Sequence, residues 1–202
     1  MSFLTATNVE CIAACSVAGA SLAANSSTSA TVLNTADGAA YLPVNFFKGN
    51  LYRTVLVTAT GIYSSPSSGA STFQIGVTLD AAQGTTGSLT FLPGAITPVA
   101  SASSWPWELF VTLTVQSLTE TTGSGTANIV GMGHLNLHGA TFGGAQSLST
   151  TANQSWQVPV GATATVNQST VAGVFCEIYG KFASSVAGST MQLEMSAIYG
   201  CN

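Results

Sequence analysis

The sequence predicts an all-β protein: a jelly-roll or β-sandwich domain of about eight strands that follows an N-terminal arm. Three observations predict this fold class. Segments of alternating apolar and polar residues recur along the chain, turns rich in Gly, Ser, Thr and Pro separate them, and no amphipathic helical pattern occurs after residue 30. We therefore expect residues 1–30 to form an arm and linker, and residues 31–202 to form the sandwich.

The clearest strand is residues 105–115, which we expect to lie centrally in a sheet. Its residues alternate with a period of two, as in a strand with one face in a core. Pro106 fits only at the start of the strand, because it has no N–H for the ladder. One predicted face is Trp107, Leu109, Val111, Leu113 and Val115, and the other is Glu108, Phe110, Thr112 and Thr114.

Four segments before this strand are expected to belong to the sheets. Residues 41–47 contain one Pro and two adjacent Phe residues, which predicts a bent start. Residues 51–63 are apolar on both faces in their middle, which indicates burial on both sides. Residues 72–79 alternate and predict a half-buried strand, and residues 88–92 predict a short strand that ends at a Pro-Gly pair.

After the central strand, residues 119–125 predict a polar turn and residues 126–138 another strand. Gly131 and Gly133 weaken that strand but allow a bulge or a close backbone approach. The remaining predicted segments are a Gly-, Ser- and Thr-rich loop at 139–155, a short edge strand at 156–160, and two last strands at 174–182 and 191–199.

The N-terminal residues 1–24 predict a weakly helical or irregular arm, and residues 25–31 a linker or a first edge strand. An arm on a joint could reach a neighbouring molecule, and an arm folded back on its own domain is equally compatible with the pattern. Residues 1–24 are apolar but lack a positively charged start, so we expect mature chain rather than a signal peptide.

The charge content limits the possible functions. Only 3 basic and 7 acidic residues occur among 202, a charged fraction of 5%, compared with about 25% in ordinary soluble domains. Three basic residues cannot form a phosphate-binding patch, so we exclude nucleic acid as a partner. No apolar run reaches the length of a membrane span. So few charges favour a protein whose surface is covered by copies of itself or by a larger assembly.

The search for chemistry finds no catalytic motif. His134 and His138, four residues apart on a strand, lie about 13 Å apart and cannot share a metal ion. No nucleophile elbow accompanies the many serines, and no phosphate loop or dinucleotide fingerprint is present. We therefore expect no enzyme activity, no metal and no cofactor.

The acidic residues and cysteines receive structural interpretations. Glu108, Glu177 and Glu194 lie within predicted strands and could line one face, where solvated or interface roles are favoured over glycoside chemistry. Cys11 and Cys15, four residues apart, could share a helical face. The four cysteines are too sparse for a disulfide framework and are expected to be buried and reduced.

Three segments resemble a group of tailed-bacteriophage structural proteins. Residues 42–47 (LPVNFF) are similar to the pattern LPxNFF of that group, and residues 53–64 (RTVLVTATGIYS) to the pattern RTLxVxAxGxxS. Residues 105–109 (WPWEL) are similar to the start of the pattern xPWxLxxxLTxRT, and the three patterns occur in the same order. The resemblance covers roughly residues 40–137. The chain departs from it at Gln116, where the group has Arg, and in its cysteine-containing arm.

The resemblance implies a non-enzymatic virion protein of the jelly-roll capsid decoration (cement) type, often a homotrimer. Such a protein would bind the outer surface of the phage head and stabilise it by bridging major capsid subunits. The residues expected to contact the capsid or a neighbouring copy are Phe3, Leu4, Val9, Ile12, His138 and Phe142.

Two other functions stay open. A phage tail or fibre component, or a module that binds host glycans, would present exposed aromatic side chains such as Trp105 and Trp156. A hydrolase would need a close Ser, His and acid constellation.

Overall fold

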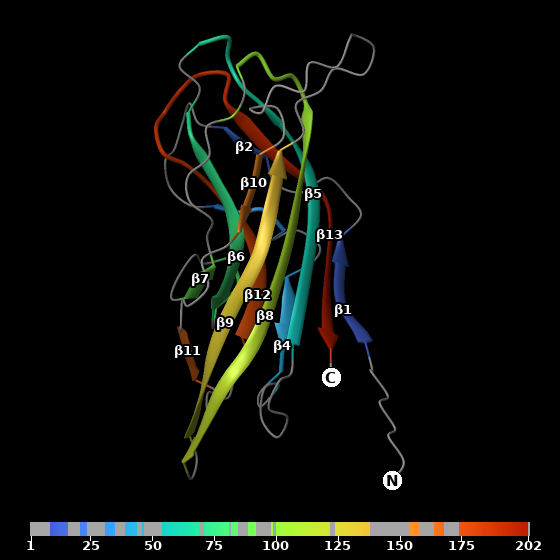
Figure 1. Ribbon diagram of the computed structural model, residues 1–202, viewed down its shortest axis with the longest axis vertical. Coiled ribbons are helices and arrows are strands. Elements are labelled where there is room, and N and C mark those ends of the chain that lie inside the picture. Colours follow the sequence, from blue (N-terminus) through green and yellow to red (C-terminus); the bar gives the residue numbers. More distant parts are fainter. Residues whose placement is uncertain are drawn as a thin grey trace.

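The protein is a β-sandwich of two antiparallel sheets (Figure 1). The computed structural model describes residues 9–15, 21–23, 31–34, 39–43, 46, 54–68, 71–80, 82–84, 89–91, 98, 100–121, 124–137, 154–157, 164–167 and 174–201. Every regular element in these ranges is a strand, as the sequence predicts. Within them, no helix is long and apolar enough to cross a membrane.

The larger sheet has eight strands, six of which form one continuous path. In spatial order these are β1 (Val9–Cys15), β13 (Thr190–Cys201), β5 (Thr54–Ser64), β8 (Trp105–Thr121), β9 (Ser124–Leu137) and β10 (Gln154–Gln157), while β2 (Ser21–Ala23) pairs with β13 and β11 (Ala164–Asn167) with β9. Figure 1 shows the long β8–β9 hairpin running beyond β5, and the last β5–β8 pair is Thr54 with Thr114.

The smaller sheet has five strands. Its order is β3 (Thr31–Val32), β12 (Val174–Phe182), β6 (Phe73–Asp80) and β7 (Leu89–Phe91), with β4 (Ala40–Leu42) also pairing with β12. The C-terminal strands thus lie between earlier strands in both sheets: β13 separates β1 from β5, and β12 separates β3 and β4 from β6.

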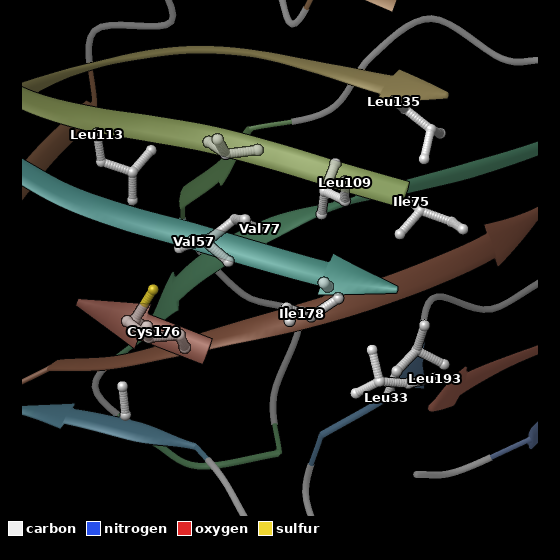
Figure 2. Packing of buried hydrophobic residues seen from close by; sticks show 14 of the residues in the cluster. Leu33, Val57, Ile75, Val77, Leu109, Leu113, Leu135, Cys176, Ile178 and Leu193 are labelled. Atoms are coloured by element: carbon white, nitrogen blue, oxygen red, sulfur yellow. The ribbon is translucent and has the colours of Figure 1, made fainter. Parts of the chain in front are cut away.

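The core lies between the two sheets. Figure 2 shows Val57, Leu109 and Leu135 of the larger sheet facing side chains of β6 and β12, and all of these residues belong to one buried cluster. Trp107 is fully buried in this core, and its indole Nε1–H donates to the Ile62 carbonyl oxygen at 3.2 Å. The predicted core face of the central strand is confirmed.

Burial of β5 and β6 differs from the sequence prediction. In β5, buried residues alternate strictly with half-buried ones, so the prediction of burial on both faces is wrong. In β6, the core-facing residues are buried, and Gly76 and Thr78 on the outer face are buried too, so this strand is covered on both faces rather than half-buried. The backbone N–H of Gly84 donates to the Glu177 carboxylate on that outer face, so the chain after β6 folds over the smaller sheet.

The β8–β9 hairpin is longer than predicted. β8 continues to Thr121 and β9 begins at Ser124, so most of the predicted polar turn at 119–125 is strand. Polar residues continue the ladder here because cross-strand backbone pairing, from Ser117–Asn128 to Thr121–Ser124, does not need an apolar face. The ladder between β8 and β9 has its bulge between Val115 and Ser117. At Gly133, the backbone of β9 closely approaches the backbone of Phe110 and Val111, as predicted.

Parts of the N-terminal arm lie on the sandwich. β1 and β2 both pair with β13, so these residues fold back on the domain, and a helix that carries Cys11 and Cys15 is ruled out. Cys176 is buried as predicted, whereas Cys11 is exposed because it lies on the outer side of an edge strand. The other residues of 1–30 lie outside the described ranges, and the boundary at residue 30 remains a prediction.

Gly61 allows β5 to pack against Trp107, its cross-strand partner. A Cβ atom at Gly61 would collide with the carbonyl oxygen of Gln192 and with the Trp107 indole ring. We expect Gly61→Ala to destabilise the fold by about 3 kcal/mol and to lower the melting temperature by about 6–12 °C. Thermal unfolding followed by circular dichroism measures this, and Thr60→Ala, on the outer face, is the control with little expected change. Equal melting temperatures for the two variants would show that the close approach is not required.

Candidate interaction face

The outer face of the larger sheet, here called the broad face, is formed by the side chains that alternate with the core residues of β5, β8, β9 and β13. Because these antiparallel ladders are in register, outward residues line up in rows across the strands. The central row is Ala197, Thr58, Phe110 and His134; one flanking row is Tyr199, Leu56, Thr112 and Met132, and the other is Met195, Thr60, Glu108 and Asn136.

Large apolar side chains on the broad face are exposed to solvent. The exposed fractions are 38% for Phe110, 56% for Met132 and 54% for Met195, and Val9 at the β1 edge reaches 59%. Among the described residues, Tyr41 of the smaller sheet is the one other large hydrophobic residue with comparable exposure. Exposed apolar groups gathered on one sheet face are typical of a surface that binds another molecule.

Two stacked rings form the centre of the broad face. Phe110 and His134 are cross-strand partners, and their rings lie 5.3 Å apart with an interplanar angle of 10°. A hollow of about 340 Å³ opens beside them, with Thr60, Glu108, Met195 and Tyr199 in its walls. The rings are thus held in place by the ladder and present a pre-formed apolar feature.

The broad face carries little formal charge. Glu108 is the one carboxylate in the three rows, Glu194 lies beside Met195 at the bulge of β13, and Lys181, the basic residue within the described ranges, lies on β12 of the other sheet. Some hydroxyl groups have partners within the sheet: the Thr54 and Thr114 Oγ1 atoms are 3.3 Å apart, and the Thr58 hydroxyl donates to the Ala197 carbonyl at 3.4 Å. This surface suits a neutral partner that contributes apolar groups and hydrogen bonds.

Glu177 is not on the broad face, and its interpretation as a solvated or interface residue is wrong. It lies on β12 and is fully buried, whereas Glu108 and Glu194 belong to strands of the larger sheet, so the three acids do not line one face. Burial raises the pKa of Glu177; the hydrogen bond from Gly84 opposes this rise and the negative charge of Asp80 adds to it.

Cys176, next to Glu177 on β12, is fully buried. Burial, and secondarily the charge of Glu177, raise the pKa of its thiol far above the usual range. A thiol in this state is a small apolar core residue and not a nucleophile.

The contact residues predicted from the sequence are only partly described. Val9 is exposed at the end of β1, and its contact role remains a prediction. Ile12 instead packs against the core, beside Gly200, so it stabilises the attachment of β1. Four others lie outside the described residues and remain predictions: Phe3, Leu4, His138 and Phe142.

The two tryptophans considered for glycan binding are placed differently. Trp105 is half-buried against the core and makes an edge contact with Tyr63, with ring centroids 6.4 Å apart. Trp156 lies on β10 and pairs with Leu135, and its side chain is outside the described part of the structure. Trp105 is thus not a fully exposed platform, and the role of Trp156 in glycan binding remains a prediction.

The sequence interpretation missed the ring pair at the centre of the broad face. A signal was present, because Phe110 is an aromatic residue on the otherwise polar face of its strand. His134 lies 24 residues further on, and only the β8–β9 register brings the two rings together.

Comparison of the chain with family models, curated proteins and solved structures finds no match.

Proposed function

We propose that this chain is a non-enzymatic virion structural protein that decorates the head of a tailed bacteriophage. It binds the outer capsid surface as a homotrimer and stabilises the shell by bridging major capsid subunits. The observation that carries this proposal is the broad face, a pre-formed and nearly uncharged sheet surface with exposed Phe110, Met132 and Met195.

Strand order supports the jelly-roll part of the proposal. In a jelly roll, two Greek keys place the last strands between earlier ones in both sheets. The paths β1-β13-β5-β8 and β3-β12-β6-β7 have this nested order, with β9 to β11 as additions beside β8.

The energetics support contact through apolar groups. Full burial of one Phe or Met side chain contributes about 1.5–3 kcal/mol, so a few anchors from one copy give modest affinity. Three copies in a symmetric ring would multiply these contacts on a capsid, whose subunits also repeat. Ion pairs contribute little, because the three rows of the broad face contain one carboxylate.

The proposal is tested by measuring the absolute mass of the purified chain and its co-sedimentation with undecorated capsids. We expect a mass three times that of the 20.3 kDa chain and saturable binding. Binding should persist in high salt, because screening weakens ion pairs but not apolar contact. A monomer that stays in the supernatant would contradict both the trimer and the capsid role.

One observation favours a second function, recognition of a host glycan by a tail or fibre component. The hollow beside Phe110 and His134 is lined by aromatic rings, the Glu108 carboxylate and threonine side chains. Its volume lies at the lower end of the usual range for small-ligand sites. Saturable binding on a glycan array that is lost in Phe110→Ala, without capsid binding by the parent protein, would favour this alternative.

A further inference from the structure

The outer face of the smaller sheet contains a buried carboxylate, and no cation among the described residues pairs with it. Glu177 is fully buried, and its two oxygens share one donor, the Gly84 N–H, at 3.0 and 3.1 Å. Lys181, the described basic residue, lies four positions further along β12 opposite Gln74 and is exposed. Burial disfavours the charged form of this carboxyl group, and a cation bound beside it would stabilise that form.

A second carboxylate and an unsatisfied hydroxyl lie on the same face. Thr78 is the direct cross-strand partner of Glu177, and Asp80 lies two residues beyond Thr78 on that side of β6. The negative charge of Asp80 acts on Glu177. The Thr78 Oγ1 atom is buried and has no hydrogen-bond partner among the described residues, so the hydroxyl does not bond to the carboxylate opposite it.

We propose that Glu177, Asp80 and Thr78 bind a divalent cation, Ca²⁺, beneath the chain segment that carries Gly84. Two carboxylates balance the charge of one divalent ion. An ion between the strands would also give the Thr78 hydroxyl a partner, which the described residues do not provide.

The ligand set favours Ca²⁺ over other metals. All the candidate ligands are hard oxygen atoms, and Ca²⁺ accepts six to eight of these in irregular arrangements, whereas Mg²⁺ needs a near-ideal octahedron. No three His, Cys, Asp or Glu side chains converge within the described ranges, so the site relies on a hydroxyl and on water. We therefore expect weak affinity, with a dissociation constant of about 0.1–1 mM, as in extracellular calcium modules.

The test is the melting temperature of the full chain in EDTA and in about 10 mM CaCl₂, with MgCl₂ and NaCl of equal ionic strength as references. We expect Ca²⁺ to raise the melting temperature by about 5 °C and the reference salts to raise it much less. The shift should vanish in Glu177→Gln, which retains an acceptor for Gly84, and persist in the control Glu194→Gln on the larger sheet. Equal shifts in these two variants, or no shift in the parent protein, would overturn the proposal.

Thr78→Val gives a test that does not remove charge. In EDTA we expect this variant to melt at a higher temperature than the parent protein, because a buried hydroxyl without a partner has been removed. In CaCl₂ its stabilisation should be smaller than that of the parent protein, because one ligand is missing. A full calcium shift in Thr78→Val would exclude the hydroxyl from the site.

Discussion

Replacing Phe110 with Asp should reduce binding to capsids by at least about 100-fold. The substitution removes an apolar anchor that contributes about 2 kcal/mol when buried, and it adds a carboxylate beside Glu108 in the adjacent row. A partner that covers this surface would bury the new charge without a counter-ion, which costs further free energy. Co-sedimentation at increasing protein concentration measures the loss.

The matched control for this variant is Tyr41→Asp. Tyr41 is also an exposed aromatic residue, with an exposed fraction of 43%, but it lies on β4 of the smaller sheet next to Phe175. We expect Tyr41→Asp to bind like the parent protein. Loss of binding in both variants, or in neither, would show that the broad face is not the contact surface.

Replacing Trp107 with Ala should destabilise the fold by about 4 kcal/mol and lower the melting temperature by about 8–16 °C. The indole is fully buried, so its loss leaves a large cavity between the sheets. The Ile62 carbonyl oxygen would also lose the indole N–H that donates to it.

Urea denaturation measures this loss, with Trp105→Ala as the control on the same strand. Trp105 is half-buried at the margin of the core, so its replacement should cost much less. A similar cost for both tryptophans would mean that the central strand does not organise the core as described.

The fold class and the central strand were predictable because they depend on local alternation. The alternation from Trp107 to Val115 requires that one face of the strand is buried, whatever covers the opposite face. In the structure, the apolar face of this strand lies in the core. Coverage of the second face depends on distant parts of the chain. The outer residues of β5 remain half-buried, whereas Thr78 of β6 is buried beneath a segment that binds Glu177.

The candidate site was less predictable for the same reason. Glu177 has an ordinary solvated-strand pattern in the sequence, and only the hydrogen bond from Gly84, more than 90 residues earlier, reveals its burial. The Phe110–His134 pair likewise depends on register across β8 and β9. Val9 is exposed on a strand that was not predicted, and its contact role remains a prediction.

The most direct test of the capsid role is the disruption temperature of undecorated capsids with and without saturating amounts of the purified chain. We predict a clear rise in disruption temperature with the parent protein, and none with Phe110→Asp at the same concentration. Capsids that bind the chain yet disrupt at an unchanged temperature would contradict a stabilising role.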